Sequence, residues 1–264
     1  KSQEYWTIHL ESRKHQHSFD AKLIQLDGKK VEQFTVINND QQADIVGRLL
    51  LASAGKTTVS RVEKKQRSRS PAAPFTTSTL QQEAVRKLGF TTSRTMRIAQ
   101  QLYEGIDVGS GTVGLITYMR TDSLNLANEA IVQIRAYIRD NFSAEYLPKL
   151  PVGYKTKSKN AQEAHEAIRP TDISRTPANV QKFLTDEQFK LYEMIWKRSV
   201  ACQMSPAKFD AVSVDLSVGS DANLFRATGQ TLVFPGFIGV YMEGVDDEEE
   251  ESETKLPALE TGEI

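Results

Sequence analysis

Tyr118 and Arg120 are the two side chains of this sequence whose types and spacing best suit chemistry on a phosphodiester. They stand two positions apart in residues 114–123, an apolar run that ends in small polar residues. If the run is extended, both side chains point the same way and face one site. A phenol is a nucleophile, and the guanidinium fork matches phosphate oxygens in pairs. The alternative is the end of an ordinary strand, with a buried tyrosine and a surface arginine.

A tyrosine nucleophile needs assistance, because a phenol with the ordinary pKa of about 10 is almost wholly protonated at neutral pH. A neighbouring cation favours the phenolate, and a base removes the proton. Arg120 is the neighbouring cation here. His165 and Arg169 form a second candidate pair. A short helical turn is expected over residues 163–169 and places a proton carrier and a phosphate-binding cation on one face. A surface pair without function is the alternative.

Three other motifs fail on their context. Residues 109–114 match G-x-G-x-x-G, but they follow a helical pattern and open an extended run, the reverse of the order in a dinucleotide site. Residues 55–57 end like a phosphate-binding loop, but Leu50 occupies the position of its first glycine. Residues 165–169 begin like the zinc-binding H-E-x-x-H helix, but Arg169 replaces the second ligand. These motifs therefore support neither a nucleotide site nor a zinc site.

Hydrophobic periodicity predicts strands first, then helices, then strands again. We expect strands over residues 4–10, 21–26, 57–69, 211–218, 224–228 and 237–241, and helices over residues 40–53, 78–88, 93–103, 125–141 and 185–203. Ser78 with Gln81, and Thr185 with Gln188, have the spacing of capping boxes. Tyr103 is expected on the inward face of its helix.

This order predicts an α+β multidomain fold, in which a mainly helical domain carrying Tyr118 is inserted into a mostly antiparallel β domain. Pro71 and Pro74 mark the first crossing, and the second is expected near residues 203–208. The expected domains are residues 1–77 and 205–264 for the β part and residues 78–204 for the helical part. The chain begins at Lys1 rather than methionine, and we interpret it as an excised piece of a longer protein.

The net charge of −1 conceals two oppositely charged regions. Residues 243–264 contain ten acidic residues and one lysine, a balance of −9, so the other 242 residues carry +8, because −1 minus −9 is +8. Residues 56–97 contain ten Lys/Arg against two Glu, a density that suits an anionic polymer such as nucleic acid; a solvated surface is the alternative. The acidic run over residues 246–253 is expected to be a solvated loop.

Cys202 is the one cysteine, so an internal disulfide and a cysteine-cluster metal site are excluded. No apolar run approaches the ~20 residues that span a bilayer, and the first residues carry no signal-peptide pattern. We expect a cytoplasmic protein without a membrane partner.

Residues 114–123, G-L-I-T-Y-M-R-T-D-S, closely resemble the active-site segment of type IA DNA topoisomerases. Three further stretches agree in the same order. Residues 74–82 resemble the entry to the tyrosine domain, residues 164–171 resemble the histidine segment, and residues 204–207 resemble the return to the arch domain. The resemblance covers essentially the whole chain. It implies two domains that together form the arch of a toroidal, DNA-gating enzyme.

The resemblance implies that Tyr118 attacks one DNA strand to form a 5′-phosphotyrosine, and that Arg120 stabilises the scissile phosphate. The residues it assigns to DNA binding or proton handling are His165, Arg169, Thr117 and Asp122. The implied substrate is single-stranded DNA. Relaxation of negative supercoils needs no ATP, because the phosphotyrosine ester conserves the energy of the broken bond. The implied location is the bacterial cytoplasm, with the nucleoid.

The sequence departs from this family in what it lacks. A complete type IA enzyme also has an N-terminal region that resembles a toprim-fold protein, with a D-x-D-x-E cluster for Mg²⁺, and a domain that closes the single-strand groove. We expect both partner domains and the Mg²⁺ site to lie outside this chain, no cofactor within it, and no relaxation by the chain alone. The alternative is a non-catalytic nucleic-acid-binding module. A tyrosine recombinase fits less well, because Tyr118 is mid-chain.

Overall fold

The computed structural model describes residues 4–155, 165–244 and 255–264. The chain forms two compact units: unit 1 is Lys1–Arg67, Phe209–Val233 and Ser252–Ile264, and unit 2 is Ser68–Lys208 and Phe234–Glu251. The acidic run expected to be a solvated loop lies outside the described residues. Unit 2 is thus inserted into unit 1 along the chain, and residues 234–244 pack with unit 2, although the sequence placed them in the β domain.

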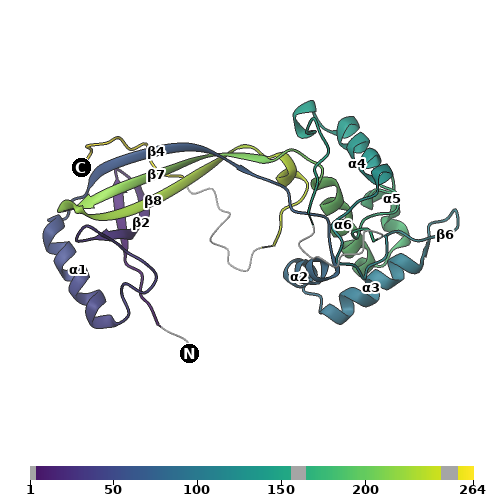
Figure 1. Cartoon of the computed structure of the whole chain (residues 1–264), viewed down its shortest axis with the longest axis horizontal. Helices are drawn as coiled ribbons and strands as arrows, with labels where there is room; N and C mark the ends of the chain where they lie inside the picture. The colour runs from purple at the N-terminus through teal and green to yellow at the C-terminus, as the bar shows by residue number, and fades with distance from the viewer. Residues whose placement is uncertain (1–3, 156–164, 245–254) are drawn as a thin grey trace. The chain divides into compact units, whose positions relative to one another are not determined.

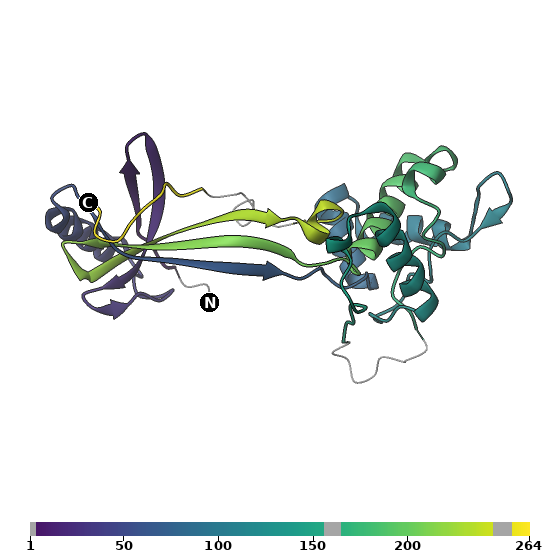
Figure 2. The ribbon, with the colours of Figure 1, turned by 90° about the horizontal axis from the view of Figure 1, so that it is seen from above.

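Unit 1 is built on an antiparallel sheet in the order β1-β2-β8-β7-β4, with β3 beside β2 (Figure 2). Its strands are β1 (His9–Lys14), β2 (His17–Leu26), β3 (Lys29–Lys30), β4 (Thr58–Arg69), β7 (Ala207–Val218) and β8 (Ser220–Phe234). The strand expected over residues 4–10 begins only at His9, because the Trp6 amide donates to the Val36 carbonyl oxygen outside the ladder. The tight turn at Asp27 and Gly28 uses positive φ angles of 50° and 76°.

Helix α1 (Asn39–Ser53) lies against this sheet (Figure 1). The Asn38 side chain caps its N-terminus by accepting from the Gln41 amide, and Ala54 ends it in the left-handed conformation. Ile45 and Leu49 are buried in the same core as side chains of the sheet. That core comprises Ile8, Phe19, Ala21, Leu23, Val36, Ile45, Leu49, Val59, Val214, Leu216, Val218, Phe225 and Ala227.

Unit 2 is mainly helical. Its helices are α2 (Thr77–Leu88), α3 (Thr92–Glu104), α4 (Asn128–Asn141), α5 (Pro177–Val180) and α6 (Asp186–Ala201), with the hairpin of β5 (Ile106–Asp107) and β6 (Thr112–Val113) and the short turns η1 (Ala144–Tyr146), η2 (Gln181–Phe183) and η3 (Gly236–Gly239). Helix α6 is central and packs against α2, α3, α4 and α5 (Figure 1). Leu191, Tyr192 and Ile195 of α6 are fully buried, so this helix organises the core of the unit.

Two capping boxes set the helix starts. Thr185 and Gln188 form the predicted box at the start of α6. The box predicted for Ser78 and Gln81 is wrong: Thr76 caps α2, and its partner is Thr79. The cap therefore lies two residues earlier and the helix starts at Thr77 instead of residue 78, which brings the backbone of its first turn to the tyrosine segment described below.

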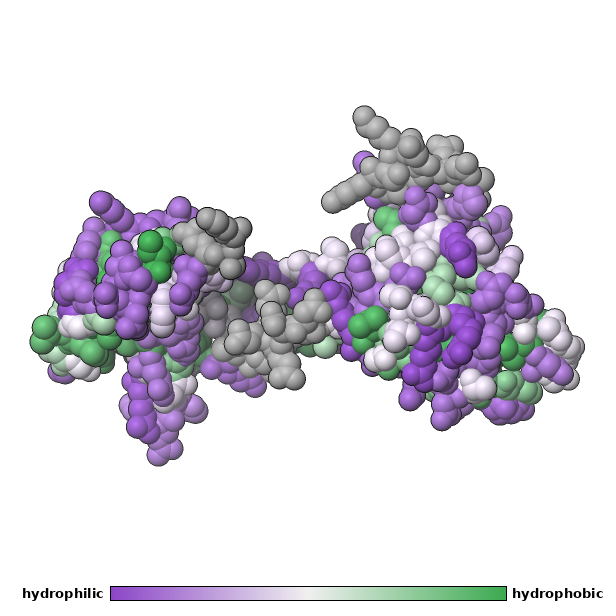
Figure 3. All heavy atoms as spheres, turned by 90° about the horizontal axis from the view of Figure 1, so that it is seen from below, coloured by the Kyte–Doolittle hydropathy of each residue, from purple (hydrophilic) through white to green (hydrophobic). Residues whose placement is uncertain are grey.

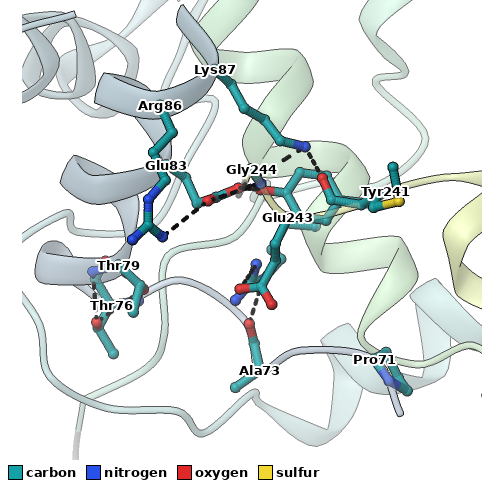
Figure 4. A network of polar contacts seen from close by, with 12 residues as sticks. Pro71, Ala73, Thr76, Thr79, Glu83, Arg86, Lys87, Tyr241, Glu243 and Gly244 are labelled. Atoms are coloured by element: carbon teal, nitrogen blue, oxygen red, sulfur yellow. Dashed lines mark hydrogen bonds and ion pairs between the residues drawn. The ribbon is translucent and has the colours of Figure 1, made fainter. Parts of the chain in front are cut away.

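The strand predicted over residues 237–241 is wrong. These residues continue from the turn at Pro235 through η3, and Tyr241 is buried against α2 (Figure 4). The Tyr241 hydroxyl donates to the carboxylate of Glu83 at 2.5 Å, and the Gly244 amide donates to the same carboxylate at 3.1 Å. Glu83 is only 2% exposed. Burial, and the hydrogen bond to Glu83, raise the pKa of the Tyr241 phenol. A polar network therefore ties residues 241–244 to α2.

The face of the molecule in Figure 3 is mostly hydrophilic, and its apolar side chains form small separate patches. Within the described part of the chain, the helices are too short or too polar to span a bilayer. The mixture of helices and an antiparallel sheet confirms the predicted α+β fold class.

The candidate active site at Tyr118

The tyrosine segment, residues 114–123, joins no regular sheet and bends at Met119 and Arg120. Leu115 and Ile116 are buried, and the Leu115 amide donates to the Leu102 carbonyl oxygen at 2.8 Å. Ile116 forms a single antiparallel bridge with Pro170. After this bridge the side chains alternate: Tyr118 and Arg120 are exposed, and Met119 between them is 1% exposed. Tyr118 and Arg120 are thus both exposed on one anchored segment, and that they face one site together stays a prediction from their spacing.

Within the described part of the chain, neither the Tyr118 hydroxyl nor the Arg120 guanidinium is bound by another group. Tyr118 is 45% exposed, and its ring meets the ring of Tyr103 in an edge-on arrangement at a centroid distance of 5.3 Å. Among residues 4–155, 165–244 and 255–264, no hydrogen bond reaches the Tyr118 hydroxyl, and no hydrogen bond or ion pair reaches the Arg120 guanidinium. Both groups are therefore available to a ligand from solvent.

Two threonine hydroxyls hold the backbone on either side of these groups. The Thr117 hydroxyl donates to the Ala167 carbonyl oxygen at 2.7 Å and accepts from the Arg169 amide at 3.0 Å. The Thr77 hydroxyl, in the first turn of α2, donates to the Met119 carbonyl oxygen and accepts from the Thr121 amide, each at 2.8 Å. The Thr77 amide also donates to the Thr121 carbonyl oxygen at 2.9 Å. The backbone is thus fixed while the Tyr118 and Arg120 side chains stay exposed.

The segment containing His165 and Arg169 is extended, so the helical turn predicted for residues 163–169 is wrong over its described residues, 165–169. Pro170 disfavours helical geometry at Arg169. The amides of residues 167–169 donate to oxygens of residues 125, 75 and 117, instead of to carbonyls one turn earlier. In an extended chain, four residues span roughly 13 Å, so His165 and Arg169 do not form a one-turn pair. The segment instead lies beside the tyrosine segment.

Arg169 is committed to a neighbour. Its guanidinium binds both carboxylate oxygens of Glu166, at 2.5 and 3.1 Å, and donates to the Pro170 carbonyl oxygen at 3.0 Å. The side chain is only 14% exposed. Burial works to raise the pKa of Glu166, but the hydrogen bond and charge of Arg169, with the Ala127 amide, lower it overall. A DNA contact by Arg169 therefore requires it to leave or share this ion pair.

His165 and Asp122 are exposed, one at the start of the Arg169 segment and the other after Arg120. Three residues near the tyrosine segment were not predicted as part of the site from the sequence: Thr77, Tyr103 and Glu166. Thr77 stands in the stretch that resembles the family entry motif, but nothing local showed that its hydroxyl turns toward residues 119–121. Tyr103 was expected to face inward and is instead 40% exposed.

The described residues contain no group of three or more His, Cys, Asp or Glu side chains arranged to hold a metal ion. The hydroxyls, phenol and guanidinium of the tyrosine segment are poor ligands for Mg²⁺, a cation that prefers carboxylate and water oxygens. The nearby carboxylate of Glu166 is paired with Arg169, which leaves Asp122 as the one carboxylate on the segment. The described residues of this segment therefore offer too few carboxylates to fit a resident Mg²⁺ site.

The antiparallel sheet with its inserted helical unit matches part of a topoisomerase I, and this match defines the class of the fold. The solved structure of full-length topoisomerase I from Thermotoga maritima matches with a TM-score of 0.71 and 33% identity, over 93% of this chain and 36% of that chain.

The chain belongs to the DNA topoisomerase family, whose sequence model matches residues 1–264. The DNA topoisomerase 1 of Xylella fastidiosa (strain Temecula1) is 53% identical over 266 residues, which are 99% of this chain and 32% of that protein. The DNA topoisomerase 1 of Rickettsia felis is 48% identical over 260 residues, 98% of this chain and 33% of that protein. The resemblance predicted from residues 114–123 is confirmed, and the chain spans about a third of the length of these relatives.

Proposed function

We propose that this chain is the part of a type IA DNA topoisomerase that carries the nucleophile, Tyr118. The observation that carries the proposal is the pair of exposed, unengaged side chains of Tyr118 and Arg120 on one clamped segment. A buried or hydrogen-bonded tyrosine would suit a structural role, and Tyr118 is neither. The family of the chain, and the relatives named DNA topoisomerase 1, support DNA as the substrate.

In the proposed reaction, the Tyr118 phenol oxygen attacks a backbone phosphorus of one DNA strand. The new bond joins this oxygen to phosphorus, the bond from phosphorus to the 3′ oxygen breaks, and the leaving 3′ oxygen takes a proton as the phenol proton is lost. Arg120 stabilises the charge that develops on the phosphate oxygens, which is worth most in a preorganised site. The 3′ hydroxyl later attacks the phosphotyrosine and restores the strand without ATP.

Other parts of the reaction lie with other domains in this proposal. The relatives are about three times as long as this chain. The part that this chain does not cover is proposed to contain the Mg²⁺ site and the strand-binding groove. Mg²⁺ would be held there by carboxylates, in the intact bacterial enzyme. His165, Asp122 and Thr117 are proposed to lie near the bound strand, with the Thr117 hydroxyl acting through its hydrogen bonds to the backbone of Ala167 and Arg169. The chain alone is proposed to be inactive in relaxation.

A covalent-adduct assay tests the proposal. The full-length topoisomerase that contains this chain is incubated with Mg²⁺ and a single-stranded oligonucleotide labelled at its 3′ end, and the mixture is denatured. We expect labelled DNA attached to the protein, none for Tyr118→Phe, and an unchanged amount for the matched control Tyr5→Phe, a tyrosine of similar exposure in unit 1. An adduct that persists in Tyr118→Phe contradicts the proposal, because another residue is then the nucleophile, and no adduct from the wild-type protein favours a non-catalytic module. The isolated chain should leave negatively supercoiled plasmid unrelaxed.

A further inference from the structure

Tyr103 is the aromatic neighbour of the proposed nucleophile. It lies in the last turn of α3, one residue before the helix ends, and its side chain is 40% exposed. Its ring approaches the ring of Tyr118 edge-on, with the centroids 5.3 Å apart and the planes at 63°. This is the preferred arrangement of two aromatic rings.

The backbones beneath the two rings are fixed to each other. The residue before Tyr103, Leu102, is fully buried and accepts the Leu115 amide at 2.8 Å. The Tyr103 carbonyl oxygen lies so close to Gly114 that a Cβ on that glycine would stand 2.7 Å from it. The glycine therefore permits the close approach of α3 to the tyrosine segment, and the ring contact does not depend on a mobile loop.

The Tyr118 ring has few other restraints. Its hydroxyl has no hydrogen bond among the described residues, and nearly half of the side chain faces solvent. Exposed side chains without such restraints change rotamer in picoseconds to nanoseconds. The ring of Tyr103 lies against the Tyr118 ring and removes the orientations of Tyr118 that would pass through it.

We propose that Tyr103 is a positioning residue for the Tyr118 nucleophile. It holds the phenol in the orientation from which its oxygen meets the scissile phosphorus. This inference rests on the proposed function of Tyr118. A displacement of about 1 Å in a reacting group lowers a rate by up to roughly 100-fold, so the loss of the ring contact should slow cleavage far more than it weakens DNA binding.

The competing role for an exposed aromatic ring is to stack on a DNA base, which adds affinity for the strand. The two roles separate in a kinetic experiment. Full-length topoisomerase with Tyr103→Leu, Tyr103→Phe or Tyr118→Phe is mixed with the 3′-labelled oligonucleotide at a series of concentrations. The rate of adduct formation at saturation and the half-saturating concentration are measured separately. Tyr5→Leu is the matched control, because Tyr5 also makes an edge-on ring contact, with Phe34, and is 46% exposed.

The expected result is that Tyr103→Leu lowers the saturating rate by about tenfold or more, with half-saturation within about twofold of wild type. Tyr103→Phe and Tyr5→Leu should behave as wild type. A wild-type rate in Tyr103→Leu overturns the proposal, and so does a loss confined to half-saturation, which assigns Tyr103 to base stacking. A Tyr103→Phe rate as low as that of Tyr103→Leu also overturns it, because the hydroxyl then carries the effect. An adduct in Tyr118→Phe refutes the proposed function itself and is scored separately.

Discussion

Thr117 and Arg169 bond to each other in both directions. The Thr117 amide donates to the Arg169 carbonyl oxygen at 2.9 Å, and the Arg169 amide donates to the Thr117 hydroxyl at 3.0 Å. The residue that follows Thr117 is Tyr118, so this pairing fixes the backbone immediately before the proposed nucleophile. The geometry makes Thr117 a support for the site through its hydroxyl.

Thr117→Val tests that support, since valine keeps the shape of threonine and removes the hydroxyl. The Arg169 amide and the Ala167 carbonyl then lose a partner, and we expect the free energy of unfolding of the chain to fall by about 1–3 kcal/mol. Thr112→Val, an exposed threonine of β6, should change it by less than about 0.5 kcal/mol. Urea unfolding of the isolated chain measures both; equal, small effects would show that the Thr117 hydroxyl is not a support.

Elements whose causes are local were predictable from the sequence. The start of α6 was predicted because Thr185 and Gln188 satisfy each other within one turn. Strand β7 was predicted from the alternation of apolar and polar residues, and strand β4 from a polar run without helical periodicity. The family of the chain was predictable because ten consecutive residues, 114–123, carry a specific motif.

Contacts between distant segments were not predictable. Residues 165–169 have a helical pattern in isolation, but their amides find partners at residues 75, 117 and 125, far away in sequence. Whether Tyr103 is exposed depends on what packs against the end of α3, and helical periodicity alone predicted that this side chain faces inward. Which hydroxyls form hydrogen bonds with the tyrosine segment is likewise determined by the folded unit and not by the local sequence.

The ion pair of Glu166 and Arg169 predicts a pH dependence of stability. The folded state lowers the pKa of Glu166, so its ionised form stabilises the fold above the pKa of the unfolded chain, about 4.3. This contribution is lost as the pH falls from about 4.3 through the lower folded value. Glu166→Gln should therefore be less stable than wild type at pH 7, and the difference should shrink below pH 4.3. Chemical unfolding across this range measures it.

The exposed Glu145 supplies the control for that experiment. Glu145→Gln should differ from wild type by a small amount at pH 7, because the Glu145 carboxylate makes no ion pair among the described residues. A difference for Glu166→Gln that stays constant or grows as the pH falls would contradict the assignment of the ion pair.

The bond of Tyr241 to the buried carboxylate of Glu83 should stabilise unit 2 (Figure 4). Tyr241→Phe removes a donor to a charged acceptor that is almost inaccessible to water, and we expect a loss of about 1.5–3 kcal/mol in the free energy of unfolding. Tyr137→Phe is the matched control, because the Tyr137 ring packs on Trp196 and its hydroxyl has no hydrogen bond among the described residues. A loss in Tyr241→Phe no larger than in the control would show that Glu83 finds another partner at no cost.

The exposed basic side chains of the edge strand β4 should contact DNA phosphates. Each phosphate contact contributes about 0.7 to the slope of log affinity against log salt for single strands, so Lys64→Gln with Arg67→Gln should reduce the slope by up to about 1.4. Lys65 should contribute less, because it is paired with Glu63 at 2.6 Å. Titration of a fluorescent oligonucleotide at several salt concentrations gives the slopes.

Neutralising Lys29 and Lys30 of β3 is the control for charge alone. If it lowers the slope as much as the β4 double variant does, general attraction rather than contact with β4 explains the binding. An unchanged slope in the β4 variant would assign its basic side chains to solvent and to protection of the sheet edge.

Gly114→Ala should displace the backbone of the tyrosine segment. Its Cβ would stand 2.7 Å from the Tyr103 carbonyl oxygen, and because that oxygen belongs to the backbone of a packed helix, the tyrosine segment must move. We expect a loss of about 1–3 kcal/mol in the free energy of unfolding and slower adduct formation by the full-length protein. The control is Gly153→Ala, where a Cβ meets nothing within 4 Å and the effect should stay below about 0.5 kcal/mol. If the stability of Gly114→Ala equals that of the control while cleavage keeps its wild-type rate, then the segment adapts without displacing Tyr118, and the close approach of Gly114 to α3 is not what positions the nucleophile.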